Sequence, residues 1–120
     1  MSSTYRDLRV WQMAMRLVLD IYRRTQTFPR EETYGLTVQL RRAAVSIASN
    51  IAEGKGRSSD KELLHFLSTA KGSLFEVETQ LMIARDLGYV DTAHSESLLR
   101  QTSEVGRLLN GLMKAFRDAA

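Results

Sequence analysis

The 120-residue chain contains no cysteine and a single proline, and it has no long apolar run. The absence of cysteine excludes disulfide bonds, thiolate metal sites and a cysteine nucleophile, and it suits a reducing cytosol. No apolar stretch approaches the roughly 18 residues that a membrane-spanning helix needs. The N-terminal sequence MSSTYRDLRVW also lacks the apolar segment of a signal peptide. We therefore expect a cytoplasmic protein with no membrane partner.

Signals for catalysis and metal binding are also few. The only two histidines, His65 and His94, fall in different helical segments, and neither has a metal-ligand companion at helical spacing. Three serines, Ser58, Ser59 and Ser73, have no obvious base beside them. The segment EGKGRSS lacks the spacing of a phosphate-binding P-loop, and a helix-capping turn is the simpler interpretation. We expect no enzymatic activity, no cofactor and no metal site.

Glycine, proline and capping residues divide the chain into four helical segments, with no convincing strand. Gly54 and Gly56 are expected to end the second helix and Gly88 the third, whereas Ser59 is expected to cap the start of the third helix and Asp91 or Thr92 that of the fourth. The expected helices cover about residues 7–25, 32–53, 60–87 and 92–117, within one domain that spans residues 1–120. Each segment carries apolar residues at i, i+3, i+4 and i+7, which predicts one stripe facing a shared core. Because the connections are short, the predicted fold class is all-α, an antiparallel up-down-up-down four-helix bundle.

The first three helical segments have more apolar surface than one core needs. This second stripe would face water in a monomer, and large apolar patches usually mark an interface. Arg41 and Glu78 fall in or beside it, so we predict a homo-oligomer in which they pair, within or between subunits. The alternatives are that loops cover the apolar face and that Arg41 extends to water. The predicted interface consists of Trp11, Met15, Val18, Tyr22, Arg41, Val45, Ala48, Ala52, Leu64, Phe75, Glu78 and Met82.

Positive charge is concentrated in the first half of the chain. Residues 1–57 hold ten Lys or Arg and five Asp or Glu, whereas residues 58–120 hold seven bases and nine acids. Most of the bases are arginine, which favours bidentate contacts with phosphate or carboxylate. The alternative is a solvated surface, in which two of these arginines stabilise a helix C-terminus. The candidate nucleic-acid-binding residues are Arg23, Arg24, Arg42, Lys55 and Arg57.

Four segments form a recognisable pattern: YRDLRVWQMA, IYRRTQTFPREETYGLTVQLRRAAVSIASNIAEG, FLSTAKGSLFEVETQL and ARDLGY. They resemble the 23S rRNA intervening-sequence proteins, a family of small four-helix bundles. That family is similar to the accessory variability determinant proteins of diversity-generating retroelements. The resemblance implies a cytosolic homo-oligomer, a pentameric ring, with basic surfaces suited to RNA or DNA. In the retroelement relatives the ring binds nucleic acid and a reverse transcriptase.

The sequence thus predicts a non-catalytic homo-oligomeric scaffold that binds RNA or DNA through basic patches, without sequence preference. The alternative is a protein-interaction module that docks a partner protein and has no direct role with nucleic acid. Salt-sensitive binding to RNA or DNA distinguishes the first function from the second.

Overall fold

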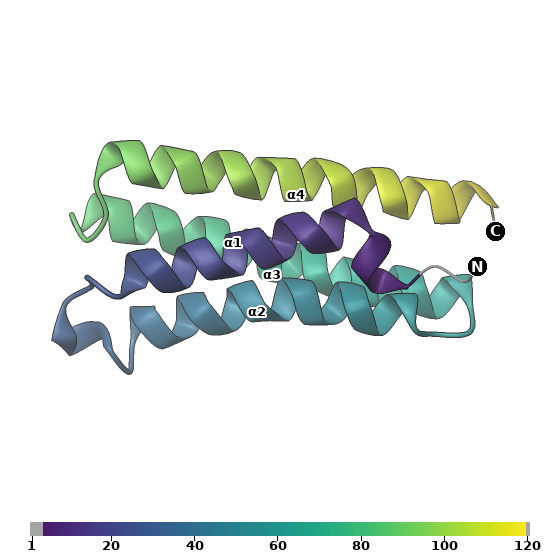
Figure 1. Cartoon of the computed structure of the whole chain (residues 1–120), viewed down its shortest axis with the longest axis horizontal. Coiled ribbons are helices and arrows are strands. Elements are labelled where there is room, and N and C mark those ends of the chain that lie inside the picture. The colour runs from purple at the N-terminus through teal and green to yellow at the C-terminus, as the bar shows by residue number, and fades with distance from the viewer. Residues whose placement is uncertain (1–3, 120) are drawn as a thin grey trace.

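The computed structural model describes residues 4–119, in which four long helices lie side by side (Figure 1). The helices are α1 (Arg9–Thr25), α2 (Leu36–Lys55), α3 (Asp60–Asp86) and α4 (Thr92–Ala119). Two short 3-10 helices, η1 (Tyr5–Asp7) and η2 (Arg30–Glu32), precede α1 and α2. No strand occurs within residues 4–119, so the predicted all-α class is confirmed.

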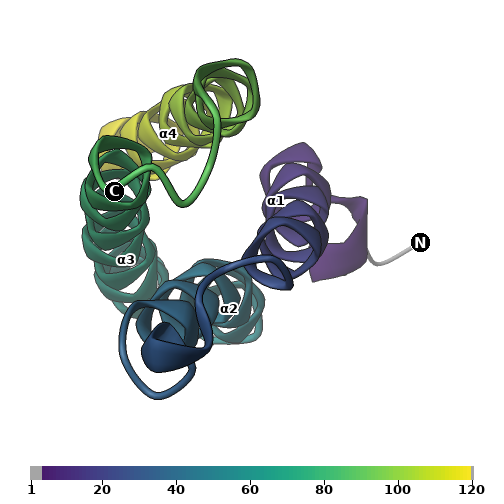
Figure 2. The same ribbon diagram turned by 90° about the vertical axis from the view of Figure 1, so that its left-hand side faces the viewer.

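The four helices surround one long axis, and the first helix packs against the last. Figure 1 places the α1–α2 and α3–α4 connections at one end of the molecule and the α2–α3 turn at the other. Each helix packs against two neighbours, α2 against α1 and α3, and α4 against α3 and α1, as the end view shows (Figure 2). The molecule is elongated, with extents of 45 × 23 × 23 Å.

One apolar core runs along the bundle, and all four helices supply it. Phe28 and Val90 extend the core into the connections, where helical periodicity makes no prediction, and the Phe28 ring packs against Tyr89. None of the described helices is long and apolar enough to cross a membrane. The largest fully buried apolar side chains are Leu17, Ile21, Leu40, Ile47, Ile51, Leu67, Leu74, Val77, Leu81, Val105 and Leu109.

The start of α2 differs from the expected helix of residues 32–53. Residues 30–32 form η2 instead, and α2 begins only at Leu36. The Glu32 side chain explains this boundary, because its Oε1 accepts the Leu36 N–H at 3.0 Å. Its other oxygen, Oε2, accepts the Tyr89 hydroxyl at 3.0 Å. Glu32 therefore caps α2 and ties it to the α3–α4 connection.

Local capping residues start α3 and α4. The Ser59 hydroxyl accepts the Glu62 N–H at 3.2 Å, as its spacing predicts. Of the two candidates for the start of α4, Asp91 is the cap, because its Oδ1 accepts the His94 N–H at 2.8 Å. Gly88, with φ of 80°, makes the left-handed turn after α3.

Gly54 has a different role from the predicted one. Gly54 and Gly56 were both expected to end α2, but α2 continues to Lys55 and only Gly56 is its C-terminal cap. Gly54 is buried, and a Cβ atom there would lie 2.8 Å from the Cβ of Phe66. The glycine therefore allows close approach of α2 and α3.

Candidate nucleic-acid and assembly surfaces

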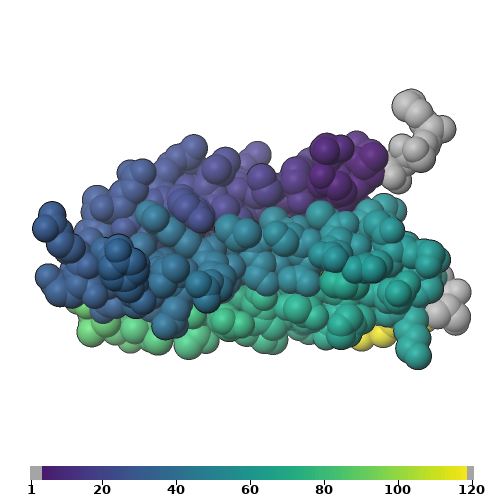
Figure 3. All heavy atoms as spheres, turned by 90° about the horizontal axis from the view of Figure 1, so that it is seen from below, coloured from purple at the N-terminus to yellow at the C-terminus, as the bar shows by residue number. Residues whose placement is uncertain are grey.

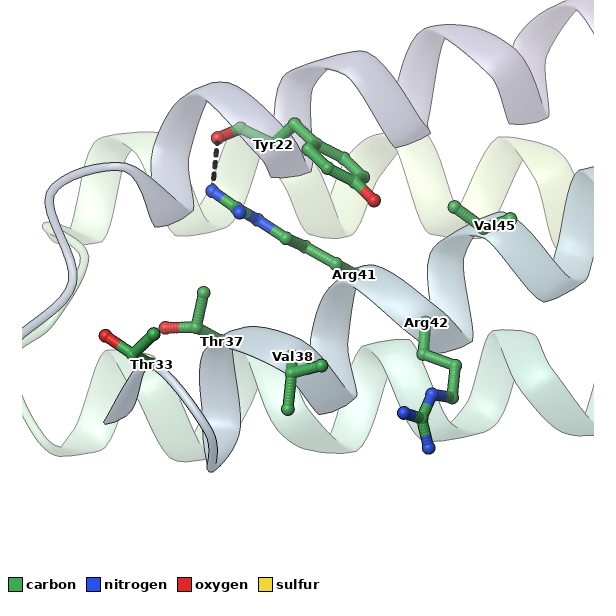
Figure 4. Close-up of a pocket in the computed structure, with 7 residues that line it drawn as sticks. All are labelled: Tyr22, Thr33, Thr37, Val38, Arg41, Arg42 and Val45. Atoms are coloured by element: carbon green, nitrogen blue, oxygen red, sulfur yellow. Dashed lines mark hydrogen bonds between the residues drawn. The ribbon is translucent and has the colours of Figure 1, made fainter. Parts of the chain in front are cut away.

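An open pocket of about 440 Å³ lies between α1 and the first half of α2, and Arg41 is on its wall. Figure 4 shows Arg41 extending from α2 toward α1, while the neighbouring Arg42 points away from it. Hydroxyl groups, two guanidinium groups and apolar side chains share the lining. The lining residues are Tyr22, Thr33, Thr37, Val38, Arg41, Arg42 and Val45.

The half-buried Arg41 is held in position by α1. Its Nε donates to the Thr25 Oγ1 at 2.7 Å, and its Nη2 donates to the Tyr22 carbonyl oxygen at 3.3 Å. The guanidinium carbon lies 4.6 Å from the centroid of the Tyr22 ring, within cation–π distance. No carboxylate of residues 4–119 forms an ion pair with Arg41. The guanidinium thus keeps a positive charge and unused N–H donors on the pocket wall.

The structure rules out the expected pairing of Arg41 with Glu78 inside one chain. The hydroxyls of Ser46 and Ser73, 2.8 Å apart, mark the side on which α2 and α3 meet. Arg41 precedes Ser46 by five residues and Glu78 follows Ser73 by five, so each is turned about 140° away from that contact. The within-chain alternative is therefore wrong, because Arg41 faces α1 and Glu78 faces away from α2. Pairing between subunits stays a prediction.

The twelve predicted interface residues differ in exposure. Ala48 is only 5% exposed and belongs to the core, which corrects its place in the interface, because an alanine between the two stripes of α2 does not reach solvent. Trp11 packs edge-on against Tyr5 of η1, with ring centroids 5.2 Å apart, so a terminal segment partly covers the stripe. The half-buried members are Trp11, Met15, Val18, Arg41, Ala52, Leu64 and Glu78. The exposed members are Tyr22, Val45, Phe75 and Met82.

The five candidate nucleic-acid-binding residues do not form one cluster. Arg23 and Arg24 lie in the last turn of α1, at the α1–α2 end of the bundle, whereas Lys55 and Arg57 lie at the opposite end. Arg42 precedes Lys55 by thirteen residues on α2, which places their backbones about 20 Å apart. Figure 3 shows the face of the molecule where α2 lies between α1 and α3. A single phosphate cannot contact all five side chains.

Two of the five candidates already have acidic partners. Arg23 pairs with Asp20 at 2.9 Å, and Arg57 pairs with Glu53 at 2.8 Å. The Arg57 guanidinium also lies 4.7 Å from the Phe66 ring centroid. Such exposed pairs are weak, so a phosphate can replace the carboxylate. They nevertheless lower the net positive charge at both ends of the bundle.

An exposed arginine row on α1 was not predicted as a unit. Arg9, Arg16 and Arg23 are spaced seven residues apart, and all three are exposed. Seven residues are nearly two helical turns, so these side chains lie on one face over about 21 Å. The seven-residue spacing of the three arginines is the sequence signal that identifies this row. We call these three residues the arginine row.

The neighbouring helix α4 brings a carboxylate close to the arginine row. Gln101 of α4 donates to Asp20 of α1 at 2.9 Å, which fixes the two helices side by side. Arg107 holds the pKa of the Glu104 carboxyl below its usual value by hydrogen bonding, and the positive charge of Arg9 adds to the effect. Arg9 of the row therefore acts on an α4 carboxylate.

Comparison with known proteins decides the family. A sequence model of the 23S rRNA-intervening sequence protein family matches residues 6–111. The chain belongs to this family. A similar solved structure is that of a protein of unknown function from the S23 ribosomal protein family of Bacteroides thetaiotaomicron. That chain is 21% identical, with a TM-score of 0.79, and the match covers 88% of this chain and 98% of that chain. At this identity the match shows the fold alone.

Membership of the 23S rRNA-intervening sequence protein family confirms the resemblance seen in the sequence. No curated protein sequence matches the chain. The family description names an rRNA segment but no activity, and the solved relative is described as having unknown function. The function of this member therefore has to be argued from its own surface.

Proposed function

We propose that this family member is a non-catalytic homo-oligomeric scaffold that binds RNA or DNA through phosphates, without reading the base sequence. Its unit is an up-down-up-down bundle, and the family resemblance favours a pentameric ring. The arginine row is the observation that carries the proposal. It places three exposed guanidinium groups on one face over about 21 Å.

Such a row suits a phosphate backbone. Duplex DNA carries about one negative charge per 1.7 Å of its axis, so a row of about 21 Å faces several phosphates at once. Guanidinium groups bind phosphate oxygens through paired N–H donors. Assembly would repeat the row in every subunit, which raises the affinity without any new contact. Each arginine is exposed at the helix surface, a position suited to backbone contact.

The binding test compares the wild type with the triple variant Arg9→Gln/Arg16→Gln/Arg23→Gln on a structured RNA. Affinity is measured by fluorescence anisotropy over a salt series. We expect the triple variant to bind at least about tenfold more weakly at low salt. The slope of log K against log salt should become shallower by about 2–3, because each lost phosphate contact removes about 0.9.

A second triple variant controls for net charge alone. Lys61→Gln/Arg85→Gln/Lys114→Gln removes the same formal charge from α3 and α4 but leaves the arginine row intact. We expect its slope to stay within about one unit of the wild-type slope. If the two triple variants lose the same affinity and the same salt slope, total charge and not the arginine row drives binding. No binding by the wild type at low salt would refute the nucleic-acid function.

A protein-interaction module is the second candidate, and one surface favours it. Tyr34 is 94% exposed in the α1–α2 connection, and Leu87, just after α3, is 55% exposed. The α1–α2 and α3–α4 connections, which hold these two residues, lie at the same end of the bundle (Figure 1). Exposed aromatic and aliphatic groups of this size are typical of protein interfaces. Nuclease-treated pull-downs that retain a partner with the wild type, and lose it with Tyr34→Ser/Leu87→Ser, would support this function.

A further inference from the structure

The Arg41 pocket is part of a mixed stripe on α2. Val38 precedes Arg41 by three residues and Val45 follows it by four, so the three side chains share one helix face. Val45 is exposed, and Arg41 has no carboxylate partner within residues 4–119. We call these three residues the Arg41 stripe. It presents one positive charge between two apolar groups.

A stripe of the same pattern and opposite charge lies on α3. Phe75 precedes Glu78 by three residues and Met82 follows it by four. Phe75 is 54% exposed and Met82 is 42% exposed, although both are large and apolar. The half-buried Glu78 carboxylate forms no ion pair within residues 4–119. These residues form the glutamate stripe, which presents one negative charge between two apolar groups.

We propose that the glutamate stripe of one copy of this chain docks into the Arg41 pocket of the next copy. The two stripes lie on different sides of the bundle, because Arg41 faces α1 and Glu78 faces away from α2. Contact between two different surfaces of identical chains is heterologous, and it generates a ring or a filament. The inference rests on the homo-oligomeric part of the proposed function and names the contact that builds it.

The pocket fits the glutamate stripe in size and chemistry. An apolar cavity of roughly 150 Å³ holds a benzene-sized ring, and the Arg41 pocket has about 440 Å³. It therefore has room for the Glu78 carboxylate together with a side chain of Phe75 or Met82. Arg41 uses one N–H for Thr25 and one for Tyr22, and the remaining donors are available to a carboxylate. Pairing satisfies two half-buried charges that each lack an ionic partner within residues 4–119.

Charge reversal tests the contact directly. Arg41→Glu and Glu78→Arg each place two like charges at the junction, so each should weaken subunit association by at least about 30-fold. In light scattering, each single variant should approach the 13.6 kDa mass of one chain. The double variant Arg41→Glu/Glu78→Arg should recover the wild-type mass. An equimolar mixture of the two single variants should associate into species larger than one chain, because every mixed junction pairs one Glu with one Arg. A ring of five cannot alternate throughout, so it keeps one like-charged junction and should be weaker than the wild-type ring.

Matched variants keep the test specific. Glu76→Arg on α3 and Arg100→Glu on α4 reverse exposed charges outside both stripes, and each should keep the wild-type mass. Circular dichroism checks that every variant is helical. Single variants that keep the wild-type mass, or a folded double variant that stays a single chain, would overturn the contact. So would a loss of RNA binding at unchanged mass, which would make the pocket a phosphate site. A wild type that is itself a single chain refutes the homo-oligomer as well.

Discussion

Replacing Gly54 tests the close approach of α2 and α3. A Cβ at this buried position would lie 2.8 Å from the Cβ of Phe66, 3.2 Å from Cδ1 of Leu63 and 3.3 Å from the Leu63 carbonyl oxygen. Two of these atoms belong to or adjoin the α3 backbone, so the helices themselves must shift. Gly54→Ala should therefore cost about 2–3 kcal/mol in overpacking. Alanine returns about 1 kcal/mol of helix propensity, which leaves a net loss of about 1–2 kcal/mol.

The assay is thermal unfolding followed by circular dichroism at one fixed protein concentration, because assembly makes Tm depend on concentration. With an unfolding entropy of about 2.1 cal/mol/K per residue, this loss lowers the Tm of a 120-residue chain by roughly 4–8 °C. Gly72→Ala is the matched control, since Gly72 is exposed on α3 and an added Cβ would meet no atom of another helix within 4 Å. It should raise the Tm by roughly 2–4 °C. A Gly54→Ala protein as stable as the control would refute the close packing.

Three further substitutions test local contacts. Ser73→Ala removes one of the hydrogen-bond partners of the Ser46 hydroxyl at a buried site, so it should lower the unfolding free energy by about 1 kcal/mol in urea titration. An unchanged midpoint would contradict this. The hydrogen bond from the His94 N–H lowers the pKa of the Asp91 carboxyl in the folded protein. The stabilisation from this helix cap is therefore fully present above the unfolded pKa of Asp91, and it is lost as the pH falls through the folded pKa. Asp91→Ala should melt below the wild type at neutral pH, with the difference closing in acid; a constant difference would exclude the carboxylate. The hydrogen bond to Glu32 raises the pKa of Tyr89. In an ultraviolet titration, Tyr89→Phe should therefore remove the tyrosine that ionises at the highest pH. If that ionisation remains in the variant, it does not belong to Tyr89.

Helix periodicity and capping residues were sufficient to predict the class and the main core. The apolar spacing in each segment is local information, and the Ser59 and Gly88 signals act within a few residues. The start of α2 could not be predicted from local sequence patterns, because Glu32 is held by Tyr89, which lies 57 residues later in the chain. The position of Gly54 inside α2 is also not predictable locally, because the glycine is required by the close approach of α3.

The candidate sites depended still more on tertiary structure. A helical wheel placed Arg41 beside apolar residues, but it did not show that α1 would supply Thr25 and the Tyr22 ring as partners. Likewise, the order of helices around the bundle turns Glu78 away from Arg41 within one chain. The seven-residue spacing of Arg9, Arg16 and Arg23 is present in the sequence, but only the structure shows that all three side chains are exposed.

The mass of the wild-type protein, measured by light scattering with and without a structured RNA at low salt, tests the central claim most directly. The proposed scaffold predicts a mass that is a whole multiple of 13.6 kDa and that rises when RNA is added. It also predicts that high salt removes the RNA and leaves the protein assembly intact, since counterion release drives only the RNA contact. A mass of 13.6 kDa that does not change when RNA is added would contradict both the assembly and the nucleic-acid function.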